Sequence, residues 1–396
     1  MFQNLTPPPE DKILQLMQVY RDDEREGKID LGVGVYRDAQ GGTPVMAAVK
    51  SAEKLIWEQQ QTKSYTSLAG EQQFNDAMVE LILGDAIERE QVASVATPGG
   101  TGAIRQAFEL IRLANPSVRV HASDPTWPNH TSILKYLNIE AVSYRYFDAD
   151  SKGIDANGML EDIATATAND VILLHGCCHN PTGANPNTAE WDAIIESLLN
   201  TGATPLIDLA YQGFGDGLEE DVASVRKIVD ACPEVIIAAS CSKNFGLYRE
   251  RTGQLLVTTQ TDDQRSVDVK QKTLAFLNRQ NYSFPPDHGA RVVSTVLSNE
   301  ELRQEWQREL EAMRLSMLEI RQQLTRELQQ LTGSDRFAFI GQHRGMFSQL
   351  GCSPSLIAAM REDHAIYMIS DSRINIAGLN TKTVPILAQA MVDVGM

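Results

Sequence analysis

The feature that most constrains the fold is a repeated pattern of short apolar runs, each followed by a polar or glycine-rich turn. Between them lie stretches of helical character, such as "TAEWDAIIESLLN". The runs with their turns are "VASVATPGGTG", "VRVHASDPTWPNH", "DVILLHGCCHNPTG", "TPLIDLAYQGFG" and "EVIIAASCSKNFG". Apolar strands that alternate with helices predict an α/β fold with a mostly parallel sheet covered on both faces. Ligands of such sheets bind outside the carboxyl ends of the strands, so we expect these turns to surround one crevice.

A different pattern occupies residues 298–331, where apolar residues recur at steps of three and four. This spacing predicts one long helix. Ser298 and Glu301 have the spacing of a capping box at its start, and Gly333 can end it. A coiled coil is one reading, but mixed α/β sequence follows, which favours a helix packed between two domains. The segments "GQHRGMFSQLG" and "AIYMISDSRINIAG" are assigned to the second, smaller domain.

Charge and cysteine content argue against several functional classes. The chain of 396 residues has a net charge of -17, and such an acidic balance disfavours nucleic acids and anionic membranes. Its 5 cysteines form no spaced disulfide framework, which favours a reducing compartment. The stretch "MFQNLTPPPEDK" lacks the features of a signal peptide, and no apolar run approaches the roughly 18 residues of a membrane-spanning helix. We therefore expect a cytoplasmic protein that binds neither nucleic acid nor membrane.

Two charged side chains follow apolar runs closely. Lys243 comes shortly after "EVIIAAS", and Asp208 lies near the end of "TPLIDL", with Tyr211 three residues further on. A charge at the end of a buried strand costs desolvation free energy unless it is paired. Lys243 is either a solvated surface group or a chemical handle at the ligand edge of the sheet. Asp208 is either a helix cap or ion-pair partner, or the partner of a protonated ring nitrogen.

The turn "TPGGTGAIRQ" places Gly99, Gly100 and Gly102, with Thr101, directly before a helical stretch. Backbone N–H groups at a helix N-terminus bind phosphate well. The turn is not a P-loop, which needs Gly-Lys-Ser/Thr, and it is not a dinucleotide fingerprint, because Arg105 stands where the third glycine belongs. A purely structural turn is the alternative.

The segment "HGCCHNPTG" contains the possible metal ligands His175, Cys177, Cys178 and His179. Adjacent ligands are expected to point apart, and no second ligand pair has the usual spacing of a zinc site, so we predict no metal. Asn180 lies in a turn signal and is placed to donate a side-chain hydrogen bond. The acidic segment "FGDGLEED" does not match a calcium loop and is expected to be a solvated turn.

Taken together, these turns resemble the motifs of the aspartate/aromatic aminotransferases, a family of fold-type I enzymes that depend on pyridoxal 5′-phosphate. The matching segments run in order along nearly the whole chain: "GVGVY", "TPGGTGA", "DPTWPNH", "HGCCHNPTG", "DLAYQGF", "SKNFGLYRER", "NYSFPP" and "SRINIAG". The resemblance implies ping-pong transamination and a homodimer with shared active sites. We expect residues 44–311 to form the large cofactor-binding domain, and residues 1–43 and 312–396 the N-terminal arm and small domain.

The resemblance also implies roles around the cofactor. Lys243 would hold the cofactor aldehyde as a Schiff base and then move a proton between the substrate Cα and the cofactor. Asp208 would keep the pyridine nitrogen protonated, and Tyr211 with Asn180 would hydrogen-bond the phenolic oxygen. Trp127 would stack on the ring. The phosphate would be held by Gly100, Thr101, Ser240 and Arg251, joined by Tyr65 from the neighbouring subunit.

Further implied roles concern the substrate. Arg373 would bind the α-carboxylate, and Gly34 would offer backbone to the same group. Arg279, from the other subunit, would reach a side-chain carboxylate. The remaining matches line the site: Trp127 and Asn180 near the substrate, and His130, His175 and Phe347 in supporting roles.

Departures from the pattern of aspartate specialists concern substrate choice. Ser64, Cys241 and Phe284 replace residues that are common in those enzymes, and "DSR" stands where "SGR" is frequent. Phe284 adds apolar area near the expected side-chain pocket, where an aromatic ring gains free energy by burial. We therefore predict an aromatic-amino-acid aminotransferase that also accepts aspartate and glutamate, with 2-oxoglutarate as partner substrate. The alternative is an aspartate aminotransferase with little aromatic activity.

Three other functions compete with transamination. A β-decarboxylase or lyase could use the same fold and cofactor, and would differ in its products. A nicotinamide dehydrogenase is disfavoured by the missing third glycine. A non-enzymatic acidic binding protein would leave Lys243 and Asp208, at neighbouring strand ends, without explanation.

Overall fold

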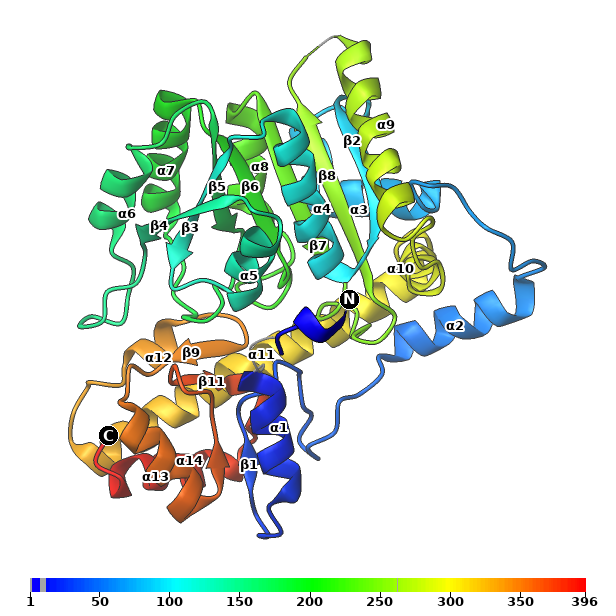
Figure 1. The fold of residues 1–396 in the computed structure, drawn as a ribbon. Coiled ribbons are helices and arrows are strands. Elements are labelled where there is room, and N and C mark those ends of the chain that lie inside the picture. Colours follow the sequence, from blue (N-terminus) through cyan, green and yellow to red (C-terminus); the bar gives the residue numbers. More distant parts are fainter. Residues whose placement is uncertain (1, 8–11, 262) are drawn as a thin grey trace. The chain divides into compact units, whose positions relative to one another are not determined.

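The protein forms two compact units in the computed structural model, which describes residues 2–7, 12–261 and 263–396 (Figure 1). The larger unit comprises residues 44–180 and 184–316, and the smaller comprises residues 1–43, 181–183 and 317–396. The division falls inside the long helix, after residue 316, whereas the sequence placed it after residue 311. The assignment of cofactor binding to the larger unit stays a prediction.

The larger unit is built on a seven-stranded sheet in the order β2-β8-β7-β6-β5-β3-β4. Its strands are β2 (Val92–Pro98), β3 (Arg119–Asp124), β4 (Glu140–Arg145), β5 (Asp170–His175), β6 (Thr204–Leu209), β7 (Glu234–Ser240) and β8 (Thr252–Thr259). Only β8 runs antiparallel to its neighbours, β2 and β7. The predicted apolar runs form β2, β3, β5, β6 and β7, which all point the same way, so the α/β prediction is confirmed. The antiparallel strand β8 was not predicted.

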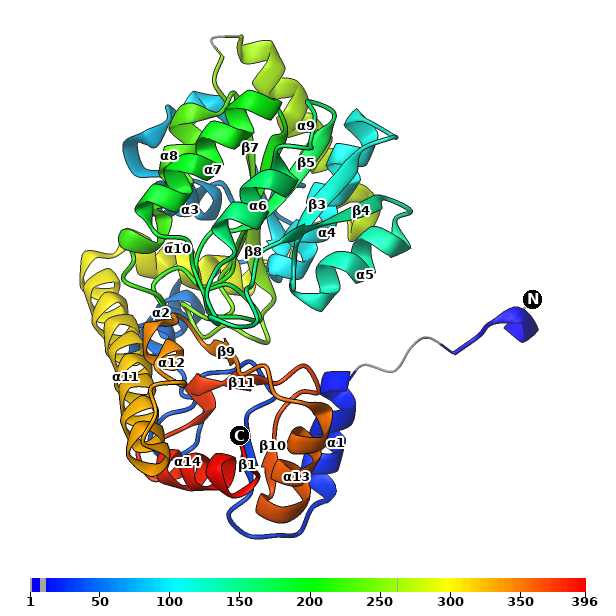
Figure 2. The same cartoon turned by 90° about the vertical axis from the view of Figure 1, so that its left-hand side faces the viewer.

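Helices cover both faces of this sheet (Figures 1 and 2). One face packs against α4 and α9 in an apolar core that includes Val95, Phe108 and Leu274. The other face packs against α3 and α8. The helices of the larger unit are α2 (Ala47–Gln59), α3 (Gln72–Leu83), η2 (Gly84–Ala86), η3 (Arg89–Gln91), α4 (Gly99–Ala114), α5 (Pro128–Tyr136), α6 (Ala156–Ile163), α7 (Thr188–Thr201), α8 (Glu220–Ala231), α9 (Gln264–Asn281) and α10 (His288–Ser298).

The predicted long helix is α11 (Glu300–Thr332), and it ends at Gly333, whose φ is +64°. The predicted capping box is wrong. Ser298 is the last residue of α10, and its hydroxyl donates to the carbonyl oxygen of Ser294 at 2.7 Å. Because the chain is still helical at Ser298, the cap shifts by one residue: Asn299 Oδ1 accepts the N–H of Leu302 at 3.1 Å. The apolar face of α11 is buried within the chain, so the coiled-coil reading is also wrong.

The smaller unit holds two short sheets, in which β1 pairs with β10 in parallel and β9 pairs with β11 antiparallel. Its core gathers apolar residues of the second half of α11, such as Leu324 and Leu328, with those of α13 and α14. The elements of this unit, besides the end of α11, are η1 (Phe2–Asn4), α1 (Lys12–Asp22), β1 (Ile29–Asp30), α12 (Phe339–Gln342), β9 (Phe347–Gln349), α13 (Pro354–His364), β10 (Ile366–Tyr367), β11 (Arg373–Asn375), η4 (Ile376–Gly378) and α14 (Thr383–Asp393).

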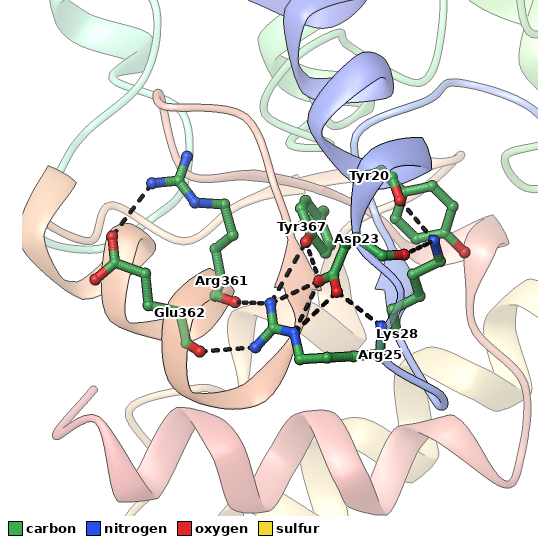
Figure 3. Close-up of polar contacts among 7 residues, drawn as sticks. All are labelled: Tyr20, Asp23, Arg25, Lys28, Arg361, Glu362 and Tyr367. Carbon is green, nitrogen blue, oxygen red and sulfur yellow. Dashed lines mark hydrogen bonds and ion pairs between the residues drawn. The ribbon is translucent and has the colours of Figure 1, made fainter.

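Polar contacts fasten the segment after α1 to α13 and β10 (Figure 3). Arg25 donates to the carbonyl oxygens of Arg361 at 2.8 Å and Glu362 at 2.7 Å, in the last turn of α13, where a cation is favoured. The carboxylate of Asp23 accepts hydrogen bonds from Arg25 and from the hydroxyl of Tyr367. The bond from Arg25 holds the pKa of the Asp23 carboxyl well below its ordinary value. These contacts fix the start of β1 beside β10.

Two expectations about the environment of the chain concern the described residues only. Among the described residues, no helix is both long and apolar enough to cross a membrane. No disulfide bond forms in this part of the chain, which contains all the cysteines. Of the stretch "MFQNLTPPPEDK", for which no signal peptide is expected, residues 1 and 8–11 lie outside the described residues.

Candidate active site

A buried carboxylate lies at the carboxyl edge of the sheet. Asp208 in β6 is the cross-strand neighbour of His175 in β5, and its Oδ2 lies 3.0 Å from Nε2 of His130. The other ring nitrogen of His130 lies 2.8 Å from the hydroxyl oxygen of Thr126. Burial by itself raises the pKa of Asp208, but the His130 hydrogen bond and the charges of His130 and Lys243 outweigh it, and the net pKa lies below the ordinary value. The site therefore offers an ionised carboxylate.

His175 beside it is an uncharged ring. Neither of its ring nitrogens has a hydrogen-bond partner among the residues that the structure describes, and the side chain is buried. Burial above all, and then the neighbouring charge of His130, lower the pKa of His175 to about 3. The ring centroid of His175 lies 4.2 Å from that of His179 and 5.3 Å from that of His130. His175 thus forms a neutral aromatic wall next to Asp208.

Lys243 belongs to this cluster and is not a solvated surface group. Its side chain is half-buried, and Nζ lies 4.7 Å from the ring centroid of Tyr211, which is buried. Its charge also lowers the pKa of Asp208, as expected for groups at neighbouring strand ends. Trp127 meets the ring of His130 edge-on, with centroids 5.1 Å apart. The structure thus brings Lys243, Tyr211, Asp208 and Trp127 together; Asn180, also buried, follows β5 in the same unit.

The start of α4 and the segment between β7 and β8 form a second part of the site. We call it the glycine cradle, and its residues are Gly99, Gly100, Ser240, Ser242 and Arg251. A Cβ atom on Gly99 would lie 2.5 Å from Arg251 Nη2, and one on Gly100 would lie 2.9 Å from Cβ of Ser240. Arg251 Nη1 also lies 3.4 Å from the hydroxyl oxygen of Ser242. Only glycine at these two positions lets the backbone approach the Arg251 guanidinium and Ser240 so closely. N–H groups at a helix N-terminus, hydroxyls and a guanidinium are donors that suit a bound anion.

The structure adds two members of the cradle to the sequence prediction. The sequence pattern does not predict Ser242, although it lies one residue before Lys243, and it identifies Gly99 only as part of the turn. Thr101, which was predicted, follows Gly100 in the same turn of α4. The signal for Gly99 is its φ of +70°, a backbone conformation that favours glycine and that the sequence cannot report directly.

Other predicted site residues of the larger unit lie in a separate, exposed cluster. Tyr65 is 82% exposed and stacks on Phe284 with ring centroids 4.6 Å apart. The guanidinium carbon of Arg279 lies 6.0 Å from the centroid of Phe284, and Arg279 Nη1 donates to the hydroxyl of Ser283 at 2.6 Å.

The remaining predicted residues form a cluster of their own in the smaller unit. The guanidinium carbon of Arg373 lies 4.2 Å from the ring centroid of Phe347, and Arg373 Nη2 donates to the carbonyl oxygen of Gly32 at 3.1 Å. A Cβ atom on Gly34 would lie 3.0 Å from Cζ of Phe347, so glycine lets the backbone approach this ring closely. We call Gly34, Phe347 and Arg373 the arginine clamp.

The expectation that adjacent ligands in the "HGCCHNPTG" segment point apart is wrong for Cys177 and Cys178. The sulfur atoms of Cys177 and Cys178 and a carboxylate oxygen of Asp221 all lie within 4.8 Å of one another. Adjacent side chains meet here because Cys178 has a φ of +50°, which a sequence pattern does not reveal. His130, His175 and Asp208 form a second group of possible ligands. The absence of a metal stays a prediction.

The acidic segment "FGDGLEED" is also not a solvated turn throughout, because Asp221 is buried. Its carboxylate accepts the backbone N–H groups of Gly213 at 2.8 Å, Gly215 at 2.9 Å and Asp216 at 2.9 Å. These bonds organise the turn that follows Tyr211. Burial nevertheless raises the pKa of Asp221 to about 6.

This raised pKa predicts a pH effect on stability. The folded state binds the Asp221 proton more tightly than the unfolded state, so the stability it contributes is present at low pH and is lost as pH rises through about 6. From about pH 5 to about pH 8, the free energy of unfolding of the wild type, relative to Asp221→Asn, should fall by about 1 kcal/mol. Urea titrations of both proteins measure this difference. A difference that rises with pH would mean that the backbone N–H groups outweigh burial.

Comparisons with known proteins agree with this arrangement. The family described as "Aminotransferase class I and II" matches residues 26–391. The chain is 58% identical over 396 residues to an aromatic-amino-acid aminotransferase of Paracoccus denitrificans, with all of both chains covered. It is 40% identical over 397 residues to an aspartate aminotransferase of Escherichia coli, again with all of both chains covered.

A solved structure shares the fold as well. It is an aromatic-amino-acid aminotransferase of Burkholderia pseudomallei covalently bound to pyridoxal phosphate, with a TM-score of 0.97 and 36% identity, covering 100% of this chain and 99% of that one. Sequence, fold and the cluster around Lys243 lead to one conclusion: the chain belongs to the class I and II aminotransferases.

Proposed function

We propose that the protein is an aromatic-amino-acid aminotransferase that uses pyridoxal 5′-phosphate and also accepts aspartate and glutamate, with 2-oxoglutarate as partner substrate. The observation that carries the reaction is the cluster of Lys243, Tyr211 and ionised Asp208 at the carboxyl edge of the sheet. The preference for aromatic substrates is supported by the 58% identity to the Paracoccus denitrificans enzyme, against 40% to the Escherichia coli aspartate aminotransferase.

The residues present fit this cofactor. The glycine cradle suits a phosphate group, because glycine lets the N-terminus of α4 lie close to the Arg251 guanidinium and to Ser240, where a Cβ would clash. Asp208 suits a protonated ring nitrogen, because it is buried and yet ionised. When bound, pyridoxal phosphate supplies a ring that accepts the electrons left on the substrate when Cα loses its proton.

The chain's own residues would then do the following. The amine of Lys243 would remove the proton from the substrate Cα, as a general base, and would deliver it to the C4′ carbon of the cofactor, as a general acid. Asp208, held by His130, keeps the ring nitrogen protonated. Tyr211 and Asn180 donate hydrogen bonds to the phenolic oxygen. The phosphate is bound by Gly100, Thr101, Ser240 and Arg251.

Substrate recognition would use two arginines. The guanidinium of Arg373 binds the α-carboxylate with two parallel hydrogen bonds, and Gly34 contributes backbone. Arg279 binds the side-chain carboxylate of aspartate, glutamate and 2-oxoglutarate. An aromatic substrate instead places its ring against apolar surface, to which Phe284 contributes.

We further propose a homodimer in which Tyr65 and Arg279 complete the site of the second copy. This is supported by their position in an exposed cluster, where Tyr65 keeps 82% of its surface accessible in the single chain. A cytoplasmic location is proposed from the cysteines, four of which are buried without forming a disulfide.

Steady-state assays test the proposed function. L-Phenylalanine, L-tyrosine and L-aspartate are each supplied with 2-oxoglutarate, and the keto-acid products are measured. We expect turnover of all three and parallel double-reciprocal plots, as in a ping-pong mechanism. Turnover of aspartate alone would favour the aspartate aminotransferase alternative, and release of carbon dioxide or ammonia would favour a decarboxylase or lyase.

The glycine cradle gives a separate prediction. Gly100→Ala should weaken binding of pyridoxal phosphate about 10-fold or more, because its Cβ would lie 2.9 Å from Cβ of Ser240 and one backbone must shift. Gly153→Ala is the matched control, since its Cβ would make an ordinary contact at 3.5 Å with Ser151. Titration of both apoproteins with the cofactor measures the change. Equal affinities in the two variants would contradict the role of the cradle.

A further inference from the structure

The buried side chains of the smaller unit include an arginine to which no role has been assigned. Arg321 lies on α11 and is completely buried. A charged group in such a place costs free energy unless several hydrogen bonds satisfy it. Its named acceptors belong to one stretch of chain, residues 340–348, which begins in α12 and ends in β9.

The guanidinium of Arg321 organises this stretch from the inside. Nη1 donates to the carbonyl oxygen of Ile340 at 2.9 Å and to the hydroxyl of Ser348 at 2.7 Å. Nη2 donates to the carbonyl oxygens of Gly345 at 2.9 Å and Phe347 at 2.7 Å. A planar guanidinium presents donors in fixed directions, so these acceptors are held in one arrangement, which a single ammonium could not reproduce.

One of these acceptors belongs to the arginine clamp. The carbonyl of Phe347 is bound by Arg321, while the ring of Phe347 lies 4.2 Å from the guanidinium carbon of Arg373. The same ring limits the space at Gly34, where an added Cβ would lie 3.0 Å from it. β9 also pairs with β11, and in this pairing Phe347 of β9 lies opposite Asn375 of β11. The position of the Phe347 backbone therefore sets where its ring meets both other members of the clamp.

Ser348 extends the network by one step. Its hydroxyl oxygen accepts from Arg321 and lies 3.1 Å from Nδ1 of His343, and both side chains are buried. The Ser348 backbone lies opposite Ile374 in β11, next to Arg373. Loss of the Ser348 hydroxyl would remove one acceptor and leave the carbonyl contacts of Arg321 in place.

We propose that Arg321 is a positioning residue for the arginine clamp: it fixes Phe347 against Arg373 and Gly34, and thereby sets the affinity for substrate carboxylates. The proposal rests on the proposed function, because it takes Arg373 as the group that binds the α-carboxylate. Arg321 itself touches no substrate. Amino acids and 2-oxo acids both carry this carboxylate. The effect of Arg321 on binding therefore extends to both half-reactions.

Two measurements on the holoenzyme test the proposal. One is the Kd of 3-phenylpropionate, a carboxylate without an amine, and the other is the set of KM and kcat values for L-phenylalanine. For Arg321→Lys and Arg321→Met, we expect Kd and KM to rise about 10-fold or more, because a displaced Arg373 guanidinium makes weaker charge-assisted hydrogen bonds to the carboxylate. The value of kcat should change less. Ser348→Ala should raise both values by a smaller factor, and it remains informative if Arg321→Met does not fold.

Leu324→Ala is the matched control. Leu324 lies on the same helix and is fully buried in the core of the smaller unit, but it takes no part in the hydrogen bonds of residues 340–348. This variant should lower Tm and leave Kd and KM near the wild-type values. An equal rise in Kd for Leu324→Ala would mean that loss of stability alone explains the effect, and would overturn the proposal.

A variant of Arg373 separates the carboxylate-binding role of the arginine clamp from the positioning role of Arg321. Arg373→Lys should weaken binding of 3-phenylpropionate; if it does not, the clamp itself is misassigned and the proposed carboxylate site fails. If Arg373→Lys weakens binding while Arg321→Lys and Arg321→Met bind as the wild type does, the clamp stands and the positioning role of Arg321 is overturned.

Discussion

Replacing Lys243 with alanine should slow transamination of every substrate by at least about 1,000-fold, since one positioned general acid–base group alone contributes about 100- to 10,000-fold. Lys243 lies 4.7 Å from the Tyr211 ring and acts electrostatically on Asp208, and the described cluster offers no second amine to replace it. The loss should appear in kcat for L-aspartate and L-phenylalanine alike, because proton removal at Cα is common to both.

The control is Lys227→Ala. Lys227 is an exposed lysine whose Nζ lies 2.7 Å from the carboxylate of Asp192, so its loss should leave turnover near the wild-type rate. Rapid-quench measurement of single half-reactions separates the chemical step from product release. Near-normal turnover in Lys243→Ala would remove the basis for the proposed mechanism.

The second large effect concerns substrate choice. Arg279→Ala should lower kcat/KM for L-aspartate by about 10- to 100-fold, because a hydrogen bond to a charged group contributes about 1.5–3 kcal/mol. The same change should leave L-phenylalanine nearly unaffected, since that substrate has no side-chain carboxylate. Half-reactions of each amino acid, measured without 2-oxoglutarate, avoid the loss that the keto acid itself would suffer.

Arg145→Ala is the matched control for this variant. Arg145 is an exposed arginine of the same unit that pairs with Glu161 and Asp162. Its loss should therefore leave kcat/KM unchanged for both aspartate and phenylalanine. Equal losses on aspartate and phenylalanine in Arg279→Ala would contradict the assigned role and point to a structural effect of Arg279 on the neighbouring Phe284.

Much of the sheet could be predicted because buried parallel strands leave a direct trace in the sequence. Strands such as β5 and β7 are covered on both faces and are therefore continuous apolar runs. The strand β8 left a weaker trace, because it carries polar residues such as Gln254. That side chain is fully buried, and its amide donates to the backbone of Asn75 at 2.9 Å. Its burial depends on a partner far away in the sequence.

The candidate site likewise contains residues that could be predicted from the sequence and residues that could not. Lys243 and Asp208 could be predicted because each stands out against an apolar strand. Asp221 could not, because its burial depends on backbone N–H groups of its own turn. The meeting of Cys177 and Cys178 depends on one positive φ, and the network of Arg321 on the path of residues 340–348. Such features arise from backbone geometry, which cannot be inferred from the pattern of residue types.

The measurement that tests the central claim most directly is the near-visible absorbance of the purified protein after reconstitution with pyridoxal phosphate. L-Phenylalanine and L-aspartate are then added in separate cuvettes, without a keto acid. We predict a band of the cofactor imine with Lys243, which Lys243→Ala does not form and which each of the two amino acids converts in the wild type. A protein that forms no cofactor band, or a band that neither amino acid changes, would contradict the account.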